Sequence, residues 1–351
     1  MTLQRLPDEQ LADMAELIRV SAMLGADPML VQSAGGNTSI KQNDRMWIKA
    51  SGTLLEEAQD KDIFVPVDLP PLRRCIAQGD PQADQPQAFL SDAAYTLRPS
   101  IETSLHAIFE QRVVLHVHCI HTLAHAIRTD ALESISHRLE GLDWVIVPYT
   151  KPGANLAKTV SKSLRMNTNI VILANHGLLV AGDSVEQALS RVLEVHERLA
   201  IDPAAKRTPD VKALAQLAEG TAYELPEHAP VHQLALEPHR VQQASSGSLY
   251  PDHVIFCGVA VTVLEPGDDL NSIEHRCAEV DCRAPVFVLV PGAGVLVRRD
   301  ASKGTRALIR CLADVLVRVP AEAPLNYLSD AQNSELLNWD AEQYRQALNA
   351  R

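Results

Sequence analysis

Short apolar segments with the period of a strand alternate with longer segments of helical period through the first 200 residues of the chain. Residues 113–119 place Val, Leu, Val and Cys at alternate positions, which is typical of a strand. Residues 3–26 instead carry apolar residues at intervals of three and four, which predicts a helix. The chain is therefore expected to mix strands and helices in its first part.

Further elements follow from the same patterns and from glycine and proline breaks. Predicted strands cover residues 45–50, 143–149, 170–174 and 178–181, and predicted helices cover 101–110, 122–128 and 184–199.

A second apolar block begins near Tyr250. It contains a predicted strand at 286–290, a glycine turn, a strand at 295–297 and a helix at 302–317, the same order as in residues 170–199. This order fits either a degenerate second copy or the common unit of a hairpin followed by a helix. With 351 residues, the chain has room for about two domains.

The charge and cysteine content exclude several classes of protein. A formal net charge of −12 is unfavourable for a general nucleic-acid binder, which needs a basic face. No apolar run approaches the roughly 20 residues needed to span a bilayer, and residues 1–10 lack a secretory signal core. The six cysteines form no C-x-x-C pair, so we expect no disulfide framework and a reducing, cytoplasmic setting.

The strongest chemical signal is the pair His116 and His118, because residues two apart on a strand face the same side. Two imidazoles on one side are able to share a metal ion, and His176, in a predicted glycine turn, is the best candidate for a third ligand. The alternative is two strand histidines with ordinary hydrogen bonds. His121 and His125 have helical spacing but lack the acidic residue of H-E-x-x-H, and we interpret them as structural.

Glu102 lies four residues before His106, near the start of a predicted helix. A carboxylate there is either a charge stabilised by the helix dipole or a general base. Glycine-rich residues 34–39, the Ser-Gly-Thr turn at 51–53 and Ser100 offer backbone and side-chain donors that are suited to a phosphate group. Each of these segments alone is also explained as an ordinary turn.

Five motifs occur in a fixed order and resemble those of the class II aldolase/adducin family, which includes sugar-phosphate aldolases and epimerases. They are A-G-G-N-T-S at 34–39, K-A-S-G-T at 49–53, P-S-I-E-T-S-L-H at 99–106, L-H-V-H at 115–118 and A-N-H-G-L-L at 174–179. The resemblance covers residues 11–199 and implies an α/β fold, a three-layer α/β/α domain with a central, mostly antiparallel sheet. It also implies a homo-oligomer, usually a tetramer.

The resemblance assigns roles to individual residues. It implies that His116, His118 and His176 bind Zn²⁺ or another divalent transition metal and that Glu102 is the acidic catalytic residue. The family's phosphate pocket corresponds to Gly36, Asn37, Ser51, Gly52 and Ser100.

The C-terminal part resembles the aldolase part of bifunctional rhamnulose-1-phosphate aldolase/alcohol dehydrogenase proteins, through Y-P-D-H at 250–253, V-L-V-P-G-A-G at 288–294 and L-N-W-D at 337–340. The sequence has no G-x-x-x-G-x-G cofactor turn, so we expect no dehydrogenase half in it. The predicted organisation is a catalytic domain at 1–205, a helical linker at 206–245 and a smaller α/β extension at 246–351.

The resemblance implies a metal-dependent aldolase that cleaves a ketose, most simply a ketose 1-phosphate, to dihydroxyacetone phosphate and an aldehyde through an enediolate. The alternatives are a dehydratase, a decarboxylase or an epimerase at the same metal site, or a non-catalytic adducin-like assembly module. The expected partners are a sugar or sugar phosphate and other copies of the chain, with no nucleic acid and no membrane.

Overall fold

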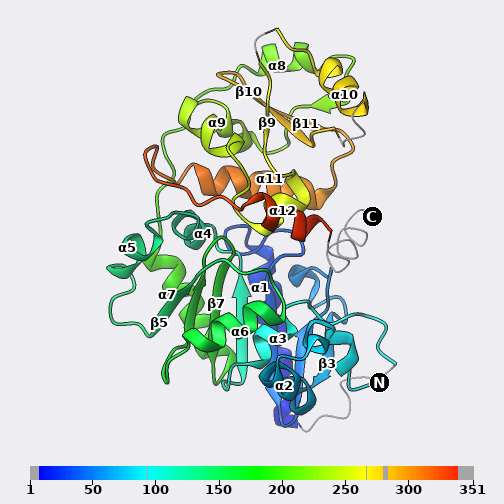
Figure 1. The fold of residues 1–351 in the computed structure, drawn as a ribbon, viewed down its shortest axis with the longest axis vertical. Helices are drawn as coiled ribbons and strands as arrows, with labels where there is room; N and C mark the ends of the chain where they lie inside the picture. The colour runs from blue at the N-terminus through cyan, green and yellow to red at the C-terminus, as the bar shows by residue number, and fades with distance from the viewer. Residues whose placement is uncertain (1–7, 93, 266, 280–283, 339–351) are drawn as a thin grey trace. The chain divides into compact units, whose positions relative to one another are not determined.

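The computed structural model describes residues 8–92, 94–265, 267–279 and 284–338 (Figure 1). The chain divides into two compact units: Met1–Ala126 with Ala131–Ala200, and Ile127–Asp130 with Ile201–Arg351. Among the described residues, no helix combines the length and the apolar character needed to cross a membrane.

The first unit is built on a seven-stranded sheet with the order β3-β2-β1-β4-β7-β6-β5. Only β5 and β6 pair in parallel, and the other neighbours are antiparallel. The strands are β1 (Asn37–Gln42), β2 (Arg45–Lys49), β3 (Phe64–Asp68), β4 (Val113–Val117), β5 (Trp144–Val147), β6 (Ile170–Leu173) and β7 (Gly177–Gly182).

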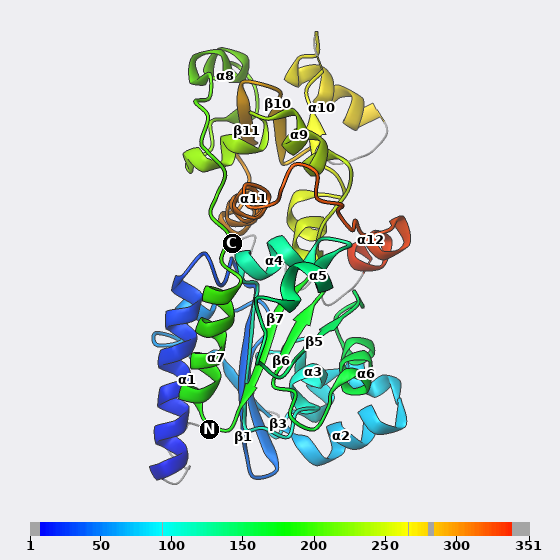
Figure 2. The ribbon, with the colours of Figure 1, turned by 90° about the vertical axis from the view of Figure 1, so that its left-hand side faces the viewer.

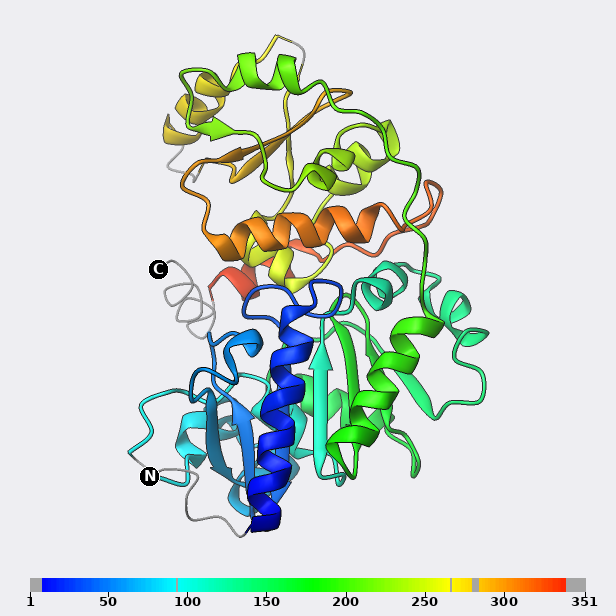
Figure 3. The same cartoon turned by 180° about the vertical axis from the view of Figure 1, so that it is seen from behind.

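Helices cover both faces of this sheet, so the unit has three layers. Figure 2 shows α1 and α7 on one face and α2, α3 and α6 on the other, and Figure 3 views the face under α1 and α7. The helices are α1 (Asp8–Ala26), α2 (Leu69–Gln78), α3 (Thr103–Ala107), α4 (Ile120–Ala126), α5 (Ala131–Ser136), α6 (Ala154–Ser163) and α7 (Val185–Arg198). This arrangement confirms the three-layer α/β/α prediction.

Alternate residues of β4 belong to different layers. Val113 and Leu115 pack in the apolar cluster that includes residues of α1 and α7, whereas Val114 packs with residues of α3 and α6. Because side chains alternate along a strand, His116 lies on the α3 face with Val114. Asn37 of β1 is the register partner of His116. The site residues of β1 and β4 therefore share the layer that contains α3.

The second unit has a four-stranded sheet with the order β8-β11-β10-β9. Its strands are β8 (Tyr223–Glu224), β9 (Thr262–Val263), β10 (Phe287–Val290) and β11 (Gly294–Arg298), and its helices are α8 (Val211–Ala218), α9 (Pro238–Ser245), α10 (Leu270–Glu279), α11 (Lys303–Leu316) and α12 (Asp330–Leu337). The hairpin β10–β11 followed by α11 repeats the order of β6, β7 and α7, as the sequence pattern predicts.

Three details differ from the sequence-based expectations. Residues 206–245 belong to the second unit rather than to a linker, because β8, too short for a periodic pattern, pairs with β11. The helix expected at 101–110 is shortened to α3: it begins only at Thr103, because Glu102 has non-helical angles of φ −90° and ψ 10°, and it ends at Ala107. Part of the glycine-rich segment 34–39 forms the start of β1. The second half of the L-N-W-D motif lies outside the described residues.

Candidate metal centre

His116 is the second-last residue of β4 and is completely buried. Its Nδ1 is 3.0 Å from the carbonyl oxygen of Leu178 in β7. A carbonyl only accepts hydrogen bonds, so Nδ1 is the protonated nitrogen and Nε2 keeps its lone pair. A backbone hydrogen bond of this kind is typical of a histidine that binds a metal through its other nitrogen.

His118 and His176 come from neighbouring segments at one edge of the sheet. His118 directly follows the end of β4, and His176 precedes Gly177, the first residue of β7. Val117 pairs with Leu178, so the two segments lie next to each other. Asn175 supports the turn with φ +54°, a conformation that asparagine tolerates better than most residues.

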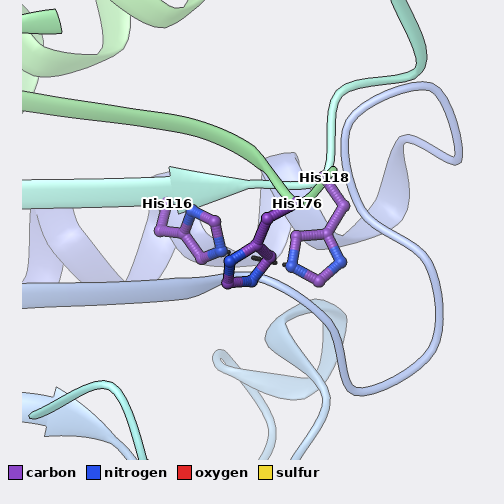
Figure 4. A group of neighbouring side chains, drawn as sticks. All are labelled: His116, His118 and His176. Atoms are coloured by element: carbon purple, nitrogen blue, oxygen red, sulfur yellow. Dashed lines mark hydrogen bonds between the residues drawn. The ribbon is translucent and has the colours of Figure 1, made fainter. Parts of the chain in front are cut away.

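The three imidazoles converge on one point (Figure 4). Their ring centroids are 4.9–5.3 Å apart, and one nitrogen from each lies within 4.8 Å of the others. The Nε2 atoms of His116 and His118 are 3.2 Å apart. Two nitrogens bound at about 2.0–2.1 Å in a tetrahedral zinc site would be about 3.3 Å apart. The donor set and its spacing therefore fit a divalent transition metal.

Two glycines allow this convergence. A Cβ atom on Gly35 would lie 2.9 Å from Nδ1 of His118. A Cβ atom on Gly177 would lie 2.6 Å from the carbonyl oxygen of Val117 and 3.3 Å from the rings of both His116 and His118. We did not predict a role for Gly177 from the sequence, although its position directly after His176 was the available signal.

Glu102 directly precedes α3 and reaches the same point. Its Oε1 is 3.5 Å from Nε2 of both His116 and His176. The side chain is buried, and Oε1 accepts no hydrogen bond from the described residues. The backbone N–H of Glu102 donates to Oγ of Ser100, which fixes the start of this segment. A buried carboxylate oxygen beside three imidazoles is well placed either to touch a bound ion or to move a proton.

Asn37 is fully buried on β1, opposite His116. Within the described chain, neither its amide nitrogen nor its amide oxygen has a hydrogen-bond partner. Buried amides are normally satisfied, so an unsatisfied one indicates a missing ligand or water. Gly36, with φ +67°, brings the preceding loop close to the carbonyl of His116, where a Cβ atom would lie 3.0 Å from that oxygen.

Ser51, Gly52 and Ser100 lie on two connected loops. A bridge joins Ala50 to Pro99, the N–H of Ser51 donates to the carbonyl of Arg98, and the N–H of Ser100 donates to the carbonyl of Lys49. Ser51 and Ser100 are buried and Gly52 is partly exposed. Each serine is therefore held by backbone pairing.

Lys49 connects two of the loops around the site by hydrogen bonds. Its buried ammonium donates to the carbonyls of Ala34 at 2.9 Å and Thr53 at 2.8 Å, which links the glycine-rich segment to the Ser-Gly-Thr turn. Sequence reasoning treated Lys49 only as part of a motif and missed this link.

Four further histidines near the candidate site or predicted beside it have protein partners. His106 is fully buried and its Nδ1 is 2.8 Å from Oγ of Ser39. Burial, followed by the nearby His116 and Lys41, holds the pKa of His106 well below its usual value, so it is neutral. His125 contacts Oγ of Ser134 and the carbonyl of Leu199, in agreement with a structural role. The ring of His121 lies 4.8 Å from that of His196.

Comparison with known proteins supports the resemblance. Residues 15–202 match the family model described as the class II aldolase and adducin N-terminal domain. A protein of Bacillus subtilis (strain 168), named as the uncharacterized oxidoreductase YuxG, is 28% identical over 197 residues. The match covers 51% of this chain and 28% of that protein, so the chain spans little more than a quarter of this relative's length.

Two solved structures are similar to a little more than half of the chain. One is the N-terminal class II aldolase domain of a conserved protein from Thermoplasma acidophilum, with 25% identity, a TM-score of 0.48, and coverage of 57% of this chain and 97% of that one. The other is an L-fuculose 1-phosphate aldolase, with 18% identity, a TM-score of 0.41, and coverage of 56% and 86%.

Proposed function

The chain belongs to the class II aldolase and adducin family, and from this premise we propose that it is a metal-dependent aldolase. Its substrate would be a ketose, most simply a ketose 1-phosphate, and its products dihydroxyacetone phosphate and an aldehyde. The observation that most supports this proposal is the position of Glu102, whose Oε1 lies 3.5 Å from Nε2 of two cluster histidines.

The ligands of the metal would be His116, His118 and His176. Three histidines favour Zn²⁺, although manganese, cobalt and iron also bind imidazole. When bound, the divalent cation supplies Lewis-acid stabilisation for the negative charge of an enediolate.

Glu102 would move the proton. Cleavage of the carbon–carbon bond requires removal of a proton from a substrate hydroxyl and delivery of one to carbon, and a carboxylate within reach serves as the general base and acid. Its buried position also keeps bulk water away from the reacting atoms. Ser100 holds the backbone of Glu102 and so helps to fix where its carboxylate lies.

Gly36, Asn37, Ser51, Gly52 and Ser100 would bind the substrate. The unsatisfied amide of Asn37 supplies one donor and one acceptor, which suits a phosphate oxygen and a sugar hydroxyl. The serine hydroxyls and the backbone of the glycine turns add donors without a net positive charge. Contacts far from the reacting carbons contribute to catalysis by orienting the substrate.

Other copies of the chain are the expected partners. We propose a homo-oligomer, because members of this family typically form one, with a tetramer as the usual form. Size-exclusion chromatography with light scattering measures its mass.

The test compares Glu102→Gln with Glu133→Gln, a matched change at an exposed position of α5. We expect Glu102→Gln to retain its metal and to lose about 10²–10⁴-fold in aldehyde release from a panel of ketose phosphates. Glu133→Gln should match the wild type. Wild-type activity in Glu102→Gln would contradict the assigned base.

Product analysis on the same panel separates cleavage from dehydration, decarboxylation and epimerisation. Metal analysis separates an enzyme from an assembly module, because a purified protein without bound metal would favour the module.

A further inference from the structure

A polar cavity lies on the first unit, lined by none of the three histidines. Its volume is about 420 Å³, within the usual range for small-molecule sites. Lys41 and Gln42 at the end of β1 line it. Asn37, the partner of His116, lies four residues earlier on the same strand, and at about 3.3 Å per residue the two ends are about 13 Å apart. The cavity is therefore separate from the candidate metal centre.

Lys41 is the central group of this cavity. It is only 6% exposed, and its ammonium donates one hydrogen bond, to the carbonyl of Gln111 at 2.9 Å. An ammonium group has three protons to donate, so two have no acceptor in the described structure. Burial and, to a smaller extent, the charge of Arg73 lower the pKa of Lys41 to about 7, although Glu110 opposes the shift. A buried cation of this kind needs an anion.

The carboxylates near Lys41 do not neutralise all the positive charge around the cavity. Arg73 is anchored by hydrogen bonds to the carbonyls of Ala107 and Phe109, and its contact with the exposed Glu110 is 3.6 Å. Arg112 pairs with Asp13 of α1. Three cationic side chains thus face two carboxylates around the cavity, which leaves one positive charge unbalanced when Lys41 is protonated.

Gln42 adds a requirement for a donor. Its Nε2 donates to the carbonyl of Gln10 at 2.9 Å, which fixes the orientation of the amide. Its Oε1 is then buried and accepts no hydrogen bond from the described residues. A ligand that satisfies both groups carries an anionic oxygen for Lys41 and a hydrogen-bond donor for Oε1 of Gln42.

We propose that this cavity binds a phosphate group that retains one hydroxyl, with its anionic oxygens toward Lys41 and its hydroxyl donating to Oε1 of Gln42. Hydrogen phosphate and the monoanion of a phosphate ester share this chemistry, whereas sulfate at neutral pH has no hydrogen to donate. The inference goes beyond the proposed function, since it concerns a binding site that the aldol cleavage does not use.

The test is calorimetric titration of the full chain with inorganic phosphate, sulfate and glycerol 3-phosphate. Phosphate should bind at least tenfold more weakly to Lys41→Met than to the wild type at this site. Lys61→Met, at an exposed lysine that does not line the cavity, should bind phosphate as tightly as the wild type. Tighter binding of glycerol 3-phosphate would identify an ester, and tighter binding of inorganic phosphate the free ion.

Proton uptake and a second variant provide independent checks. Bound phosphate favours the charged form of Lys41, so the protein should take up protons when phosphate binds near pH 7.5. The number of protons is obtained from the binding enthalpy in buffers of different ionisation enthalpy. The charged groups that line the cavity with Lys41 are Arg73, Glu110, Arg112 and Asp13, and the buried, neutral His106 also lies near Lys41. Gln42→Ala should reduce the preference for phosphate over sulfate. Equal phosphate affinity in Lys41→Met and the wild type, or equal binding of sulfate and phosphate by the wild type, would overturn the proposal. No activity is measured, so this result is independent of the proposed aldolase.

Discussion

Gly177→Ala tests whether a glycine beside the histidines is required for their convergence. The added Cβ would lie 2.6 Å from the carbonyl oxygen of Val117, a distance that real Cβ atoms essentially never show. It would also lie 3.3 Å from the rings of His116 and His118. The carbonyl belongs to β4, which pairs on both sides, so the strand cannot easily move away.

The expected cost has two parts. Overpacking of this kind costs about 1–3 kcal/mol of unfolding free energy. Displaced histidine ligands should also weaken metal binding by at least tenfold, or about 1.4 kcal/mol. Urea unfolding measures the first effect, and competition with a chromophoric chelator measures the second.

Gly79→Ala is the control for this experiment. Gly79 has φ +69°, and a Cβ atom added there would have no neighbour within 4 Å, so its substitution should cost about 1–2 kcal/mol through backbone strain alone. Its metal affinity should equal that of the wild type. If Gly177→Ala bound metal as tightly as Gly79→Ala, the argument that this glycine makes room for the ligands would be refuted.

Three further predictions concern stability, substrate binding and the metal. Burial lowers the pKa of His253 to about 4, so below about pH 6.5 the unfolded chain takes up a proton that the folded chain does not. The unfolding free energy should therefore fall as the pH drops from about 6.5 to 4, by up to about 3 kcal/mol, and His253→Leu should flatten this slope in urea titrations. Lys49→Met leaves the carbonyls of Ala34 and Thr53 without the ammonium that donates to them, and we expect the unfolding free energy to fall by about 1–3 kcal/mol. Because these carbonyls belong to the loops that would bind the substrate, KM should rise more than kcat falls in steady-state kinetics. Dialysis against a chelator should lower both the melting temperature and the cleavage rate, and added Zn²⁺ should restore both.

The sequence predicted much of the first unit because its strands and helices carry clear periods. The strand predicted at 113–119 and the helix predicted at 184–199 agree closely with β4 and α7. The position of β1 was harder to predict, since Asn37, Thr38 and Ser39 are polar residues buried in a strand and resemble a turn. Burial on both faces of the sheet, rather than local preference, makes them a strand.

The candidate site was predicted from spacing and order, but its packing was not. The pairing of His116 and His118 follows from the period of a strand, while their approach to His176 depends on the register between β4 and β7. The links made by Lys49 and the room left by Gly177 depend on contacts between segments far apart in the chain. Such contacts appear only when the sheet is assembled.

Metal analysis of the purified protein tests the central claim most directly. The account predicts about one divalent transition-metal ion per chain, with X-ray absorption showing three nitrogen ligands at about 2.0–2.1 Å if the ion is zinc. His176→Ala should lose most of this ion, whereas His125→Ala, at a structural histidine, should retain it. An equal metal content and an unchanged ligand shell in His176→Ala would contradict the account.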